Sequence, residues 1–244
     1  MSEVALLIIG AVLGAIFSKG TEWSLDWFRK QKNPESPRVI TSVDVLSWGW
    51  NGEKLLKKLI ALDRKILGDE LTSDSREGTV DQWAPLFMRD VDGWSAIAID
   101  RQIIGYYSFF ALIEDSYERA KRGHLLDSEV TIDNTVPFDV PGIYKGYFVL
   151  IGADPKFSGA GRKLLDSFFD NLQALAERGV LFEEMLANAF TADGKRTCEG
   201  FGMEKLCDHS DFGVVYSLRL KPWPSRLDFK RWQEIKQLYE ERLK

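Results

Sequence analysis

The chain has 244 residues, which is enough for one large domain or for one domain with appended segments. Its hydrophobic fraction of 45% and charged fraction of 28% are typical of a globular protein. The formal net charge of −5 provides no excess positive charge to attract phosphate backbones, which argues against nucleic acid as a partner. Two cysteines, Cys198 and Cys207, are too few for a disulfide framework and have no metal-ligand company, so we expect a reducing compartment and no metal site.

The N-terminal segment differs from the rest of the chain. Residues 4–18, VALLIIGAVLGAIFS, contain no charged side chain. As a helix this run would span about 22 Å, short of the roughly 30 Å hydrocarbon core of a bilayer. The next stretch has aromatic side chains that could extend the helix into the headgroup region. Basic side chains follow the apolar run but do not precede it (Lys19, Arg29, Lys30, Lys32).

Three interpretations of this segment compete. A secretory signal peptide needs a basic start and a small-residue cleavage site, but Glu3 is the only early charge. A buried core helix fits the length. We favour a single-pass membrane anchor over residues 1–30, with the body in the cytoplasm by the positive-inside rule; a soluble cytoplasmic protein is the alternative. Gly10 and Gly14 form a GxxxG pattern, which would let two such helices pack closely as a homo-oligomer.

A polar linker and a mixed α/β body follow. Residues 31–37, QKNPESP, contain two prolines and predict the linker. We expect the body over residues 38–220 and a separate C-terminal helical segment over residues 221–244. Runs rich in β-branched and aromatic residues predict strands, and apolar residues at helical spacing predict helices. In chain order the predicted elements are a strand at Arg38–Leu46, helices at Asn51–Gly68 and Thr79–Arg89, strands at Gly93–Ile99 and Gln102–Ile113, a polar connection at Glu114–Gly142 with a short helix or hairpin, a strand at Tyr144–Ile151, a helix at Gly159–Arg178, a strand at Val180–Phe190, a helix at Ala192–Gly202, strands at Met203–Cys207 and Gly213–Leu220, and a helix at Leu227–Lys244.

The sharpest local feature is ADPKFSGAGRKLLDSFF, residues 153–169, where a strand passes through a glycine-containing turn into a long amphipathic helix. The first turn of a helix has unpaired N–H groups and a partial positive charge. Gly159 and Gly161 let a ligand approach the main chain closely. The segment therefore predicts an anion site suited to pyrophosphate, although a purely structural turn fits it as well. The spacing is neither that of the P-loop nor that of the Rossmann fingerprint. Formal charge is added by Lys156, Arg162 and Lys163.

Over residues 38–220 the order of elements resembles the GNAT acetyltransferase superfamily. Ala153-Asp154-Pro155 is similar to the hydrophobic-x-Pro step that ends the family's central strand. KFSGAG, residues 156–161, is similar to the family's [Q/R]xxGx[G/A] loop, with Lys in the first position and a turn two residues shorter. TADGKRTCEGFGM, residues 191–203, resembles the pattern NxxAxxLYEKxGF, with matches at Glu199 and Gly202.

This resemblance implies a mixed, mostly antiparallel sheet flanked by helices, and acyl transfer from acetyl-CoA to an amine acceptor. It implies that main-chain amides of the loop hold the coenzyme A pyrophosphate and that an N–H near residues 151–153 stabilises the oxyanion. Asn188, near the end of its strand, either contacts the pantetheine arm or has a structural role there. The coenzyme A-binding residues that it implies are Ile151, Ala153, Lys156, Ser158, Gly159, Ala160, Gly161, Arg162 and Asn188.

The proton donor and the proton acceptor are less clear. Cys198 takes the place of the family's tyrosine, which protonates the departing thiolate; a thiol with a reference pKa near 8.5 can do the same, or it can simply pack a helix. No base stands out among the residues near the central strand (Tyr144, Lys145, Tyr147, Asp139, Glu184, His124). The sequence therefore predicts an acetyl-CoA-dependent N-acyltransferase acting on a small amine or a protein amine. The alternative is a membrane-tethered interaction module with the same fold and weak or no activity.

Overall fold

A computed structural model describes residues 36–68, 78–225, 227 and 230–243. The chain divides into two units, Met1–Pro37 and Arg38–Lys244. The predicted anchor, residues 1–30, lies outside the described residues. Within the described ranges, no helix is both long enough and apolar enough to span a bilayer.

The second unit is built on one sheet of eight strands in its described part. Its strands are β1 (Arg38–Ile40), β2 (Trp94–Ile99), β3 (Gln102–Leu112), β4 (Thr135–Val136), β5 (Gly142–Ala153), β6 (Val180–Ala189), β7 (Glu204–Asp208) and β8 (Val214–Arg219). The strand order is β1-β2-β3-β5-β6-β8-β7, and the short β4 pairs with β3. Every pair is antiparallel except β5 and β6, which run parallel. The predicted mixed, mostly antiparallel sheet is therefore confirmed.

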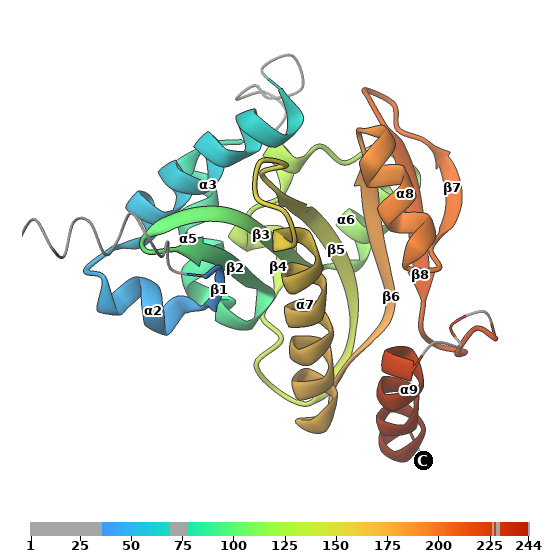
Figure 1. The fold of residues 1–244 in the computed structure, drawn as a ribbon. Coiled ribbons are helices and arrows are strands. Elements are labelled where there is room, and N and C mark those ends of the chain that lie inside the picture. Colours follow the sequence, from blue (N-terminus) through green and yellow to red (C-terminus); the bar gives the residue numbers. More distant parts are fainter. Residues whose placement is uncertain (1–35, 69–77, 226, 228–229, 244) are drawn as a thin grey trace, which may run out of the picture. The chain divides into compact units, whose positions relative to one another are not determined.

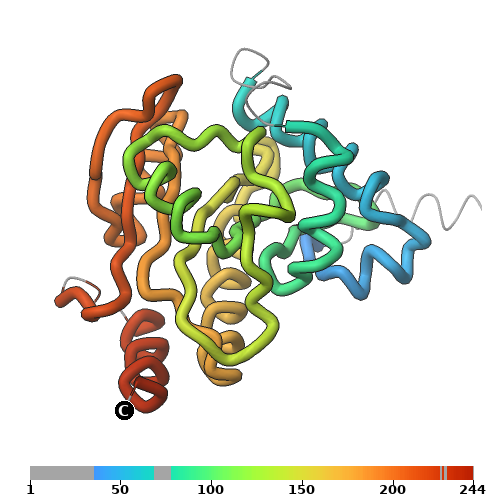
Figure 2. The backbone as a smooth tube through the Cα atoms, turned by 180° about the vertical axis from the view of Figure 1, so that it is seen from behind, coloured from blue at the N-terminus to red at the C-terminus, as the bar shows by residue number. Residues whose placement is uncertain are grey.

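Helices cover both faces of this sheet. They are α2 (Ser42–Ser47), α3 (Gly52–Leu67), α5 (Val80–Arg89), α6 (Glu114–Lys121), α7 (Ala160–Glu177), α8 (Ala192–Gly200) and α9 (Lys230–Arg242). Helix α7 makes the crossover between the parallel strands β5 and β6 and lies in front of the sheet in Figure 1. Figure 2, seen from behind, shows α6 and the connection after it on the opposite face.

Strand β3 separates two hydrophobic cores because successive side chains of a strand point to opposite faces. Tyr107 and Phe109 belong to the core under α7 and α9. Tyr106 and Phe110 belong to the core under α3, α5 and α6. All four side chains are almost completely buried. The sheet is therefore covered on both sides, and a ligand site has to open between its elements.

The C-terminal segment packs into the first of these cores. Trp232 of α9 is fully buried, and its ring packs edge-on against the ring of Phe169 of α7, with 4.9 Å between the ring centroids. The main-chain N–H of Phe182 donates to the hydroxyl of Tyr239 at 2.9 Å. Helix α9 is thus part of the same compact unit as the sheet.

The predicted strand at Arg38–Leu46 is wrong beyond its third residue. Strand β1 ends at Ile40, and α2 begins at Ser42. The carboxylate of Asp44 accepts the N–H of Thr41 at 3.1 Å and pairs with Arg38 at 2.7 Å. This local capping overrides the strand preference of the two valines that follow Thr41. The other predicted elements appear close to their expected positions, and the polar connection at Glu114–Gly142 contains α6 and β4.

Candidate functional site

Strands β5 and β6 separate halfway along their length. Their parallel pairing runs from Gly142 opposite Val180 to Phe148 opposite Ala187, and β5 then continues to Ala153 without β6. At the point of separation the register between β5 and β3 shifts, which leaves Val149 as an extra residue in β5. Such a bulge bends its strand and ends regular pairing. The two strands therefore diverge and leave a gap in the sheet.

The divergence leaves one edge of β5 open. On its other side β5 still pairs with β3, and the N–H of Asp154 donates to the carbonyl of Ile104 at 2.8 Å. Main-chain groups of alternate residues in a strand face opposite neighbours. The N–H and C=O groups of Ile151 and Ala153 therefore face the gap, where an extended ligand can pair with them as an added strand would.

A tight turn connects the open strand to α7. The carboxylate of Asp154 accepts the N–H of Lys156 at 3.0 Å, and the carbonyl of Asp154 accepts the N–H of Phe157 at 3.0 Å. Gly159 then caps the helix with a φ of 80°, a left-handed conformation that favours glycine. The cap makes no side-chain hydrogen bond, so no side chain competes with an anion for the first-turn N–H groups.

Gly161 keeps this helix start open. Its φ is not positive, and a Cβ built on it meets no atom within 4 Å. Neither backbone strain nor internal packing therefore requires a glycine there. The glycine instead leaves free space in front of the first helical turn, on the side that faces the gap.

The gap and the helix start together form a cleft of about 530 Å³, within the range of small-molecule sites. Its walls come from the second half of β5, the turn, the first turns of α7, the end of β6 and the start of α8. Seven of the ten residues predicted for the site line this cleft: Ile151, Ala153, Ser158, Gly159, Gly161, Asn188 and Cys198.

The other three predicted residues lie outside the lining. Lys156 and Arg162 are exposed on either side of the turn, where their charges add to the field of the helix start. Ala160 is fully buried in the core beneath α7, and its N–H donates to the carbonyl of Phe157 at 3.2 Å. Ala160 therefore anchors the turn and has no free amide to offer a ligand.

Cys198 reaches the cleft from α8 but is a poor acid. It is 7% exposed, and burial, with a smaller effect of the charge on Glu199, raises its pKa to about 12. A thiol that holds its proton this strongly gives it up less readily than an ordinary thiol with a pKa near 8.5. The position agrees with the predicted donor, whereas the acidity favours a packing role.

The side chain of Asn188 is held by the turn between β7 and β8. Its side-chain N–H₂ donates to the carbonyl of Phe212 at 3.1 Å, in the turn between β7 and β8. Its buried Oδ1 has no hydrogen-bond partner among the described residues. The ring of Phe212 stacks on that of Phe190, which also lines the cleft, with the planes 7° apart. Asn188 and Phe190 thus close the end of the cleft away from α7.

A second, smaller cavity of about 50 Å³ lies on the other face of the sheet, between α3, α5 and strands β3 and β5. Leu67, Val149, Leu150 and Phe190 line both this cavity and the cleft. The two spaces therefore meet across the same residues at the separation of β5 from β6. The sequence analysis did not predict this cavity.

The polar side chains that line the second cavity come from three segments, namely α3, β3 and the connection after α6. The hydroxyl of Tyr106 in β3 donates to the carboxylate of Asp63 in α3 at 2.8 Å. The hydroxyl of Tyr147 in β5 donates to the carboxylate of Asp127 at 2.7 Å. Asp63, Tyr106, Asp127 and Ser108 all line the cavity. Two signals in the sequence could have pointed to part of this set, namely an aspartate beside the apolar stripe of the helix and the three hydroxyl groups of the strand QIIGYYSFFAL.

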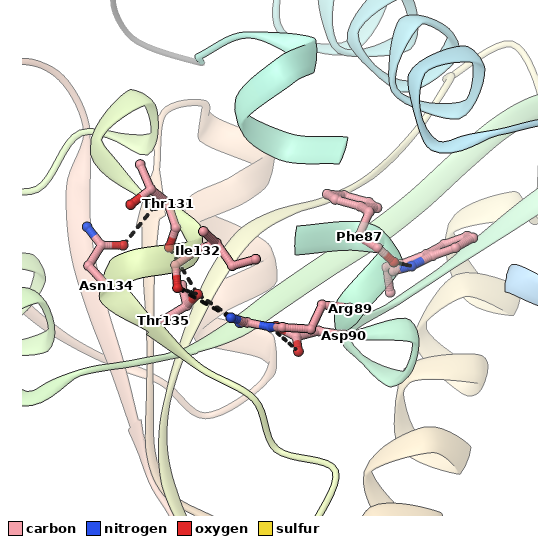
Figure 3. A network of polar contacts seen from close by, with 8 residues as sticks. Phe87, Arg89, Asp90, Thr131, Ile132, Asn134 and Thr135 are labelled. Atoms are coloured by element: carbon pink, nitrogen blue, oxygen red, sulfur yellow. Dashed lines mark hydrogen bonds and ion pairs between the residues drawn. The ribbon is translucent and has the colours of Figure 1, made fainter. Parts of the chain in front are cut away.

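A polar network fixes the connection that carries Asp127. Figure 3 shows Arg89, at the end of α5, directed at Asp90 beside it and at residues of the 131–135 turn. The guanidinium donates to both carboxylate oxygens of Asp90, at 2.9 and 2.7 Å, and to the hydroxyl of Thr135 at 2.8 Å. The amide of Asn134 accepts the N–H of Thr131 at 2.8 Å within the same turn. These bonds tie the connection after α6 to α5, so that both border the cavity.

The base candidates named from the sequence lie elsewhere. Glu184 pairs with Lys121 at 2.7 Å and accepts the hydroxyl of Ser217, in the part of β6 that is still paired with β5. Lys145 pairs with Glu114 at 2.6 Å, and the hydroxyl of Tyr144 donates to the carbonyl of Val140. None of these three candidates lines the cleft or the cavity, nor do Asp139, His124 and Tyr147.

No protein-family model matches the sequence, and no curated protein matches it in sequence. Solved structures do match. A protein from Pyrococcus horikoshii, PH1933, shares 16% identity over 75% of this chain and 98% of its own, with a TM-score of 0.47. A GNAT-family acetyltransferase from Staphylococcus aureus matches at 9% identity over 76% of this chain and 99% of its own, with a TM-score of 0.44. The ribosomal-protein-S18-alanine N-acetyltransferase of Escherichia coli matches at 11% identity over 80% of this chain and all of its own, with a TM-score of 0.40. Two of these three proteins are described as acetyltransferases, one of them of the GNAT family, and none of the three matches tests a substrate or a site residue of this chain.

Proposed function

We propose that this protein is an acyl-CoA-dependent N-acyltransferase, with acetyl-CoA as the donor and an amine as the acceptor. One observation carries the proposal. The only parallel strand pair of the described sheet separates beside a helix start that has no side-chain cap. The resulting cleft offers an extended main-chain edge and an anion site next to each other, which suits a ligand with an amide-containing arm and a diphosphate.

The residues present fit such a ligand. The N–H groups in the first turn of α7 and the charges of Lys156 and Arg162 would hold the diphosphate. The space in front of Gly161 would admit it, because a Cβ there meets no protein atom. The open main-chain groups of Ile151 and Ala153 would pair with the amides of the arm. The volume of about 530 Å³ suffices for the part of the ligand that lies in the cleft.

When bound, acyl-CoA would supply a thioester, whose C–S bond breaks as the C–N bond to the amine forms. The chain's own part is to bind, orient and move protons. An N–H on the open edge of β5 would stabilise negative charge on the carbonyl oxygen. The acceptor has to lose a proton to become a nucleophile, and the departing thiolate has to gain one. Cys198 lines the cleft and could donate that second proton, although its raised pKa makes it a weak acid.

The second candidate function is a binding module that holds acyl-CoA without turning it over. The raised pKa of Cys198 favours this reading, as does the shortened turn after Pro155. Both readings share the cleft and differ in the chemistry alone.

Calorimetry followed by product analysis tests the proposal. We expect the full chain to bind acetyl-CoA with micromolar affinity and to release coenzyme A thiol only when an amine is added. Binding without amine-dependent thiol release would support the module. The absence of binding would overturn both readings.

We also propose that residues 1–30 hold the body at the cytoplasmic face of a membrane. The support is the uncharged run at residues 4–18, with basic side chains on its C-terminal side alone. Fractionation of the full chain and of a chain that lacks residues 1–30 tests this. We expect the first in the membrane fraction and the second in the soluble fraction. Recovery of both in the soluble fraction would contradict the anchor.

A further inference from the structure

We infer that the second cavity holds the acyl chain of the acyl-CoA donor, and that Ser108 of β3 sets the length of that chain. This assignment rests on the proposed function and deepens it, because it names the class of acyl group. The chain passes from the cleft, through the gap between β5 and β6, to the face of the sheet opposite α7. The preferred acyl group is therefore a short, unbranched alkanoyl group that is longer than acetyl.

The cleft and the cavity meet at apolar side chains. The lining residues that the two spaces share are Leu67, Val149, Leu150 and Phe190. All four are partly exposed, as expected for side chains that border open space. A charged group would lose its hydration among them, whereas an alkyl chain gains free energy when it leaves water. The part of a ligand that crosses from the cleft into the cavity is therefore a hydrocarbon.

The direction of the donor in the cleft brings its acyl end to this boundary. In the proposed function the diphosphate lies at the start of α7, and the arm runs along the open edge of β5 at Ala153 and then Ile151. The next residues of β5 in that direction are Leu150 and Val149, which line both spaces. An acyl chain longer than acetyl continues in the same direction and enters the cavity.

Ser108 is a small residue between two large ones. Because alternate residues of a strand point to the same face, Ser108 lies between Tyr106 and Phe110 on the side of α3 and α5. Ser108 also pairs with Leu150 across the β3–β5 ladder, and directly opposite residues have neighbouring side chains. The space that the serine leaves is part of the cavity and lies beside its boundary with the cleft.

A hydrogen bond to the protein does not account for this serine. Its side chain is 0% exposed, and its Oγ has no hydrogen-bond partner among the described residues. A buried hydroxyl without a partner lowers stability, and an apolar side chain that filled the space would raise it. The serine therefore contributes room for a ligand rather than stability, as Gly161 does at the start of α7.

The volume of the cavity sets the length of the chain. At roughly 10 to 15 Å³ for each water-sized group, a volume of about 50 Å³ admits about three to five non-hydrogen atoms. With the carbonyl carbon and the next carbon still in the gap, the whole acyl group has about five to seven carbons. The polar side chains Asp63 and Asp127 accept the hydroxyls of Tyr106 and Tyr147. Most of the other walls are apolar and come from α3 and α5: Leu56, Leu59, Ile60, Trp83 and Phe87.

Calorimetry of the full chain with a series of acyl-CoA ligands tests the inference and needs no acceptor. The series is coenzyme A, acetyl-CoA, butyryl-CoA, hexanoyl-CoA and decanoyl-CoA. Each added methylene group that fits the cavity should tighten binding roughly fourfold, up to hexanoyl-CoA. Decanoyl-CoA should bind more weakly than hexanoyl-CoA, because its chain exceeds the cavity. Hexanoyl-CoA that binds no more tightly than acetyl-CoA, or decanoyl-CoA that binds more tightly than hexanoyl-CoA, would overturn the inference.

Ser108→Val fills the cavity and removes no hydrogen bond to a described residue, so the melting temperature should not fall. The preference for hexanoyl-CoA over acetyl-CoA should fall roughly tenfold. Ile60→Phe narrows the cavity from α3 and should reduce the same preference. Ser95→Ala is the control on the neighbouring strand; Ser95 lines neither space and its hydroxyl donates to the carbonyl of Ile40 at 3.2 Å, so it should lose stability and keep the preference. An unchanged preference in Ser108→Val, or in Ile60→Phe if Ser108→Val fails to fold, would contradict the assignment.

The same ligands, with thiol release in the presence of an amine as a second readout, separate the inference from the proposed function. Equal binding of acetyl-CoA and hexanoyl-CoA with amine-dependent thiol release would overturn the inference and leave the proposed function in place. Tighter binding of hexanoyl-CoA without thiol release would support the acyl-chain cavity and overturn the transferase. Binding of none of these ligands would overturn both.

Discussion

The two halves of the β5–β6 pair are formed by the same two strands, but only one half is hydrogen-bonded between them. From Gly142 to Phe148 the strands are hydrogen-bonded to each other, and Glu184 is bonded to Lys121 and Ser217 beside them. From Val149 to Ala153, β5 has lost β6, and its free edge faces the cleft. One half holds the sheet together, and the other leaves main-chain N–H and C=O groups of β5 without a strand partner on that side.

The difference shows where an unpaired backbone is tolerated. A buried N–H or C=O without a partner costs free energy, so a sheet usually pairs its strands completely. Here a bulge at Val149 ends the pairing of β5 with β6 shortly before α7 begins. The unpaired edge of β5 and the uncapped start of α7 then border the same cleft. A substitution in the open half should therefore affect ligand binding, and one in the paired half should affect stability.

The largest effect is expected for Gly161→Glu in the open half. The new side chain fits the fold, because a Cβ there meets nothing and an acidic residue suits a helix N-terminus. It would occupy and repel the diphosphate, and affinity for acetyl-CoA should fall by about 100-fold or more, at about 1.5 to 3 kcal/mol for each lost charge-assisted bond. Calorimetry measures the affinity, and circular dichroism checks the fold.

Gly200→Glu is the matched control for that substitution. Gly200 is also exposed, has no positive φ and has no atom within 4 Å of a built Cβ, but it lies at the end of α8 outside the cleft lining. It should retain full affinity. Equal losses in both variants would show that added charge, rather than position, weakens binding.

In the paired half, Glu184→Gln should lower the free energy of unfolding at neutral pH by about 1 to 3 kcal/mol and leave acetyl-CoA affinity unchanged. Burial by itself would raise the pKa of Glu184, but hydrogen bonds from Lys121 and Ser217 outweigh it and lower the pKa below its ordinary value. The carboxylate therefore stabilises the fold above the unfolded-state pKa, near 4.3, and this stabilisation is lost as pH falls through the lower folded-state pKa.

Chemical denaturation of the parent and Glu184→Gln at several pH values between about 3 and 7 tests this. The difference in the free energy of unfolding between the parent and the variant should become smaller as the pH falls below about 4. A difference in the free energy of unfolding that does not change with pH, or a loss of acetyl-CoA affinity in the variant, would contradict the assignment of stability to the paired half and of binding to the open half.

The smallest effect is expected for Cys198→Ala. A buried thiol with a pKa raised to about 12 is a weak acid, so turnover should stay within a few-fold of the parent while the melting temperature falls by a few degrees. A loss of turnover near 100-fold at unchanged stability would show instead that Cys198 is the proton donor. Turnover and melting temperature are measured on the same preparation.

Most of the architecture could be predicted from the sequence because its signals are local. The periodic helix at Gly159–Arg178 and the strands around it appear as α7, β5 and β6. The predicted strand at Arg38–Leu46 failed after Ile40, because one aspartate three residues after Thr41 caps a helix there. β-branched residues do not reveal such a cap.

The candidate site was predictable only where it is contiguous in the chain. The turn at residues 153–161 has its own glycines and charges, so it could be recognised without the fold. The cavity with Asp63, Ser108 and Asp127 joins three segments that are far apart in sequence, and its place depends on the pairing of β3 with β5. The pKa of Cys198 likewise depends on burial, which no sequence motif reports.

Amide hydrogen exchange, followed by NMR for each residue with and without acetyl-CoA, tests the central claim most directly. The claim is that the ligand pairs with the open half of β5 and with the start of α7. Acetyl-CoA should slow exchange at Ile151, Ala153 and Gly161 and leave residues 142–148 unchanged, because that half is already paired. Binding of acetyl-CoA with no added protection at these three amides would contradict the account.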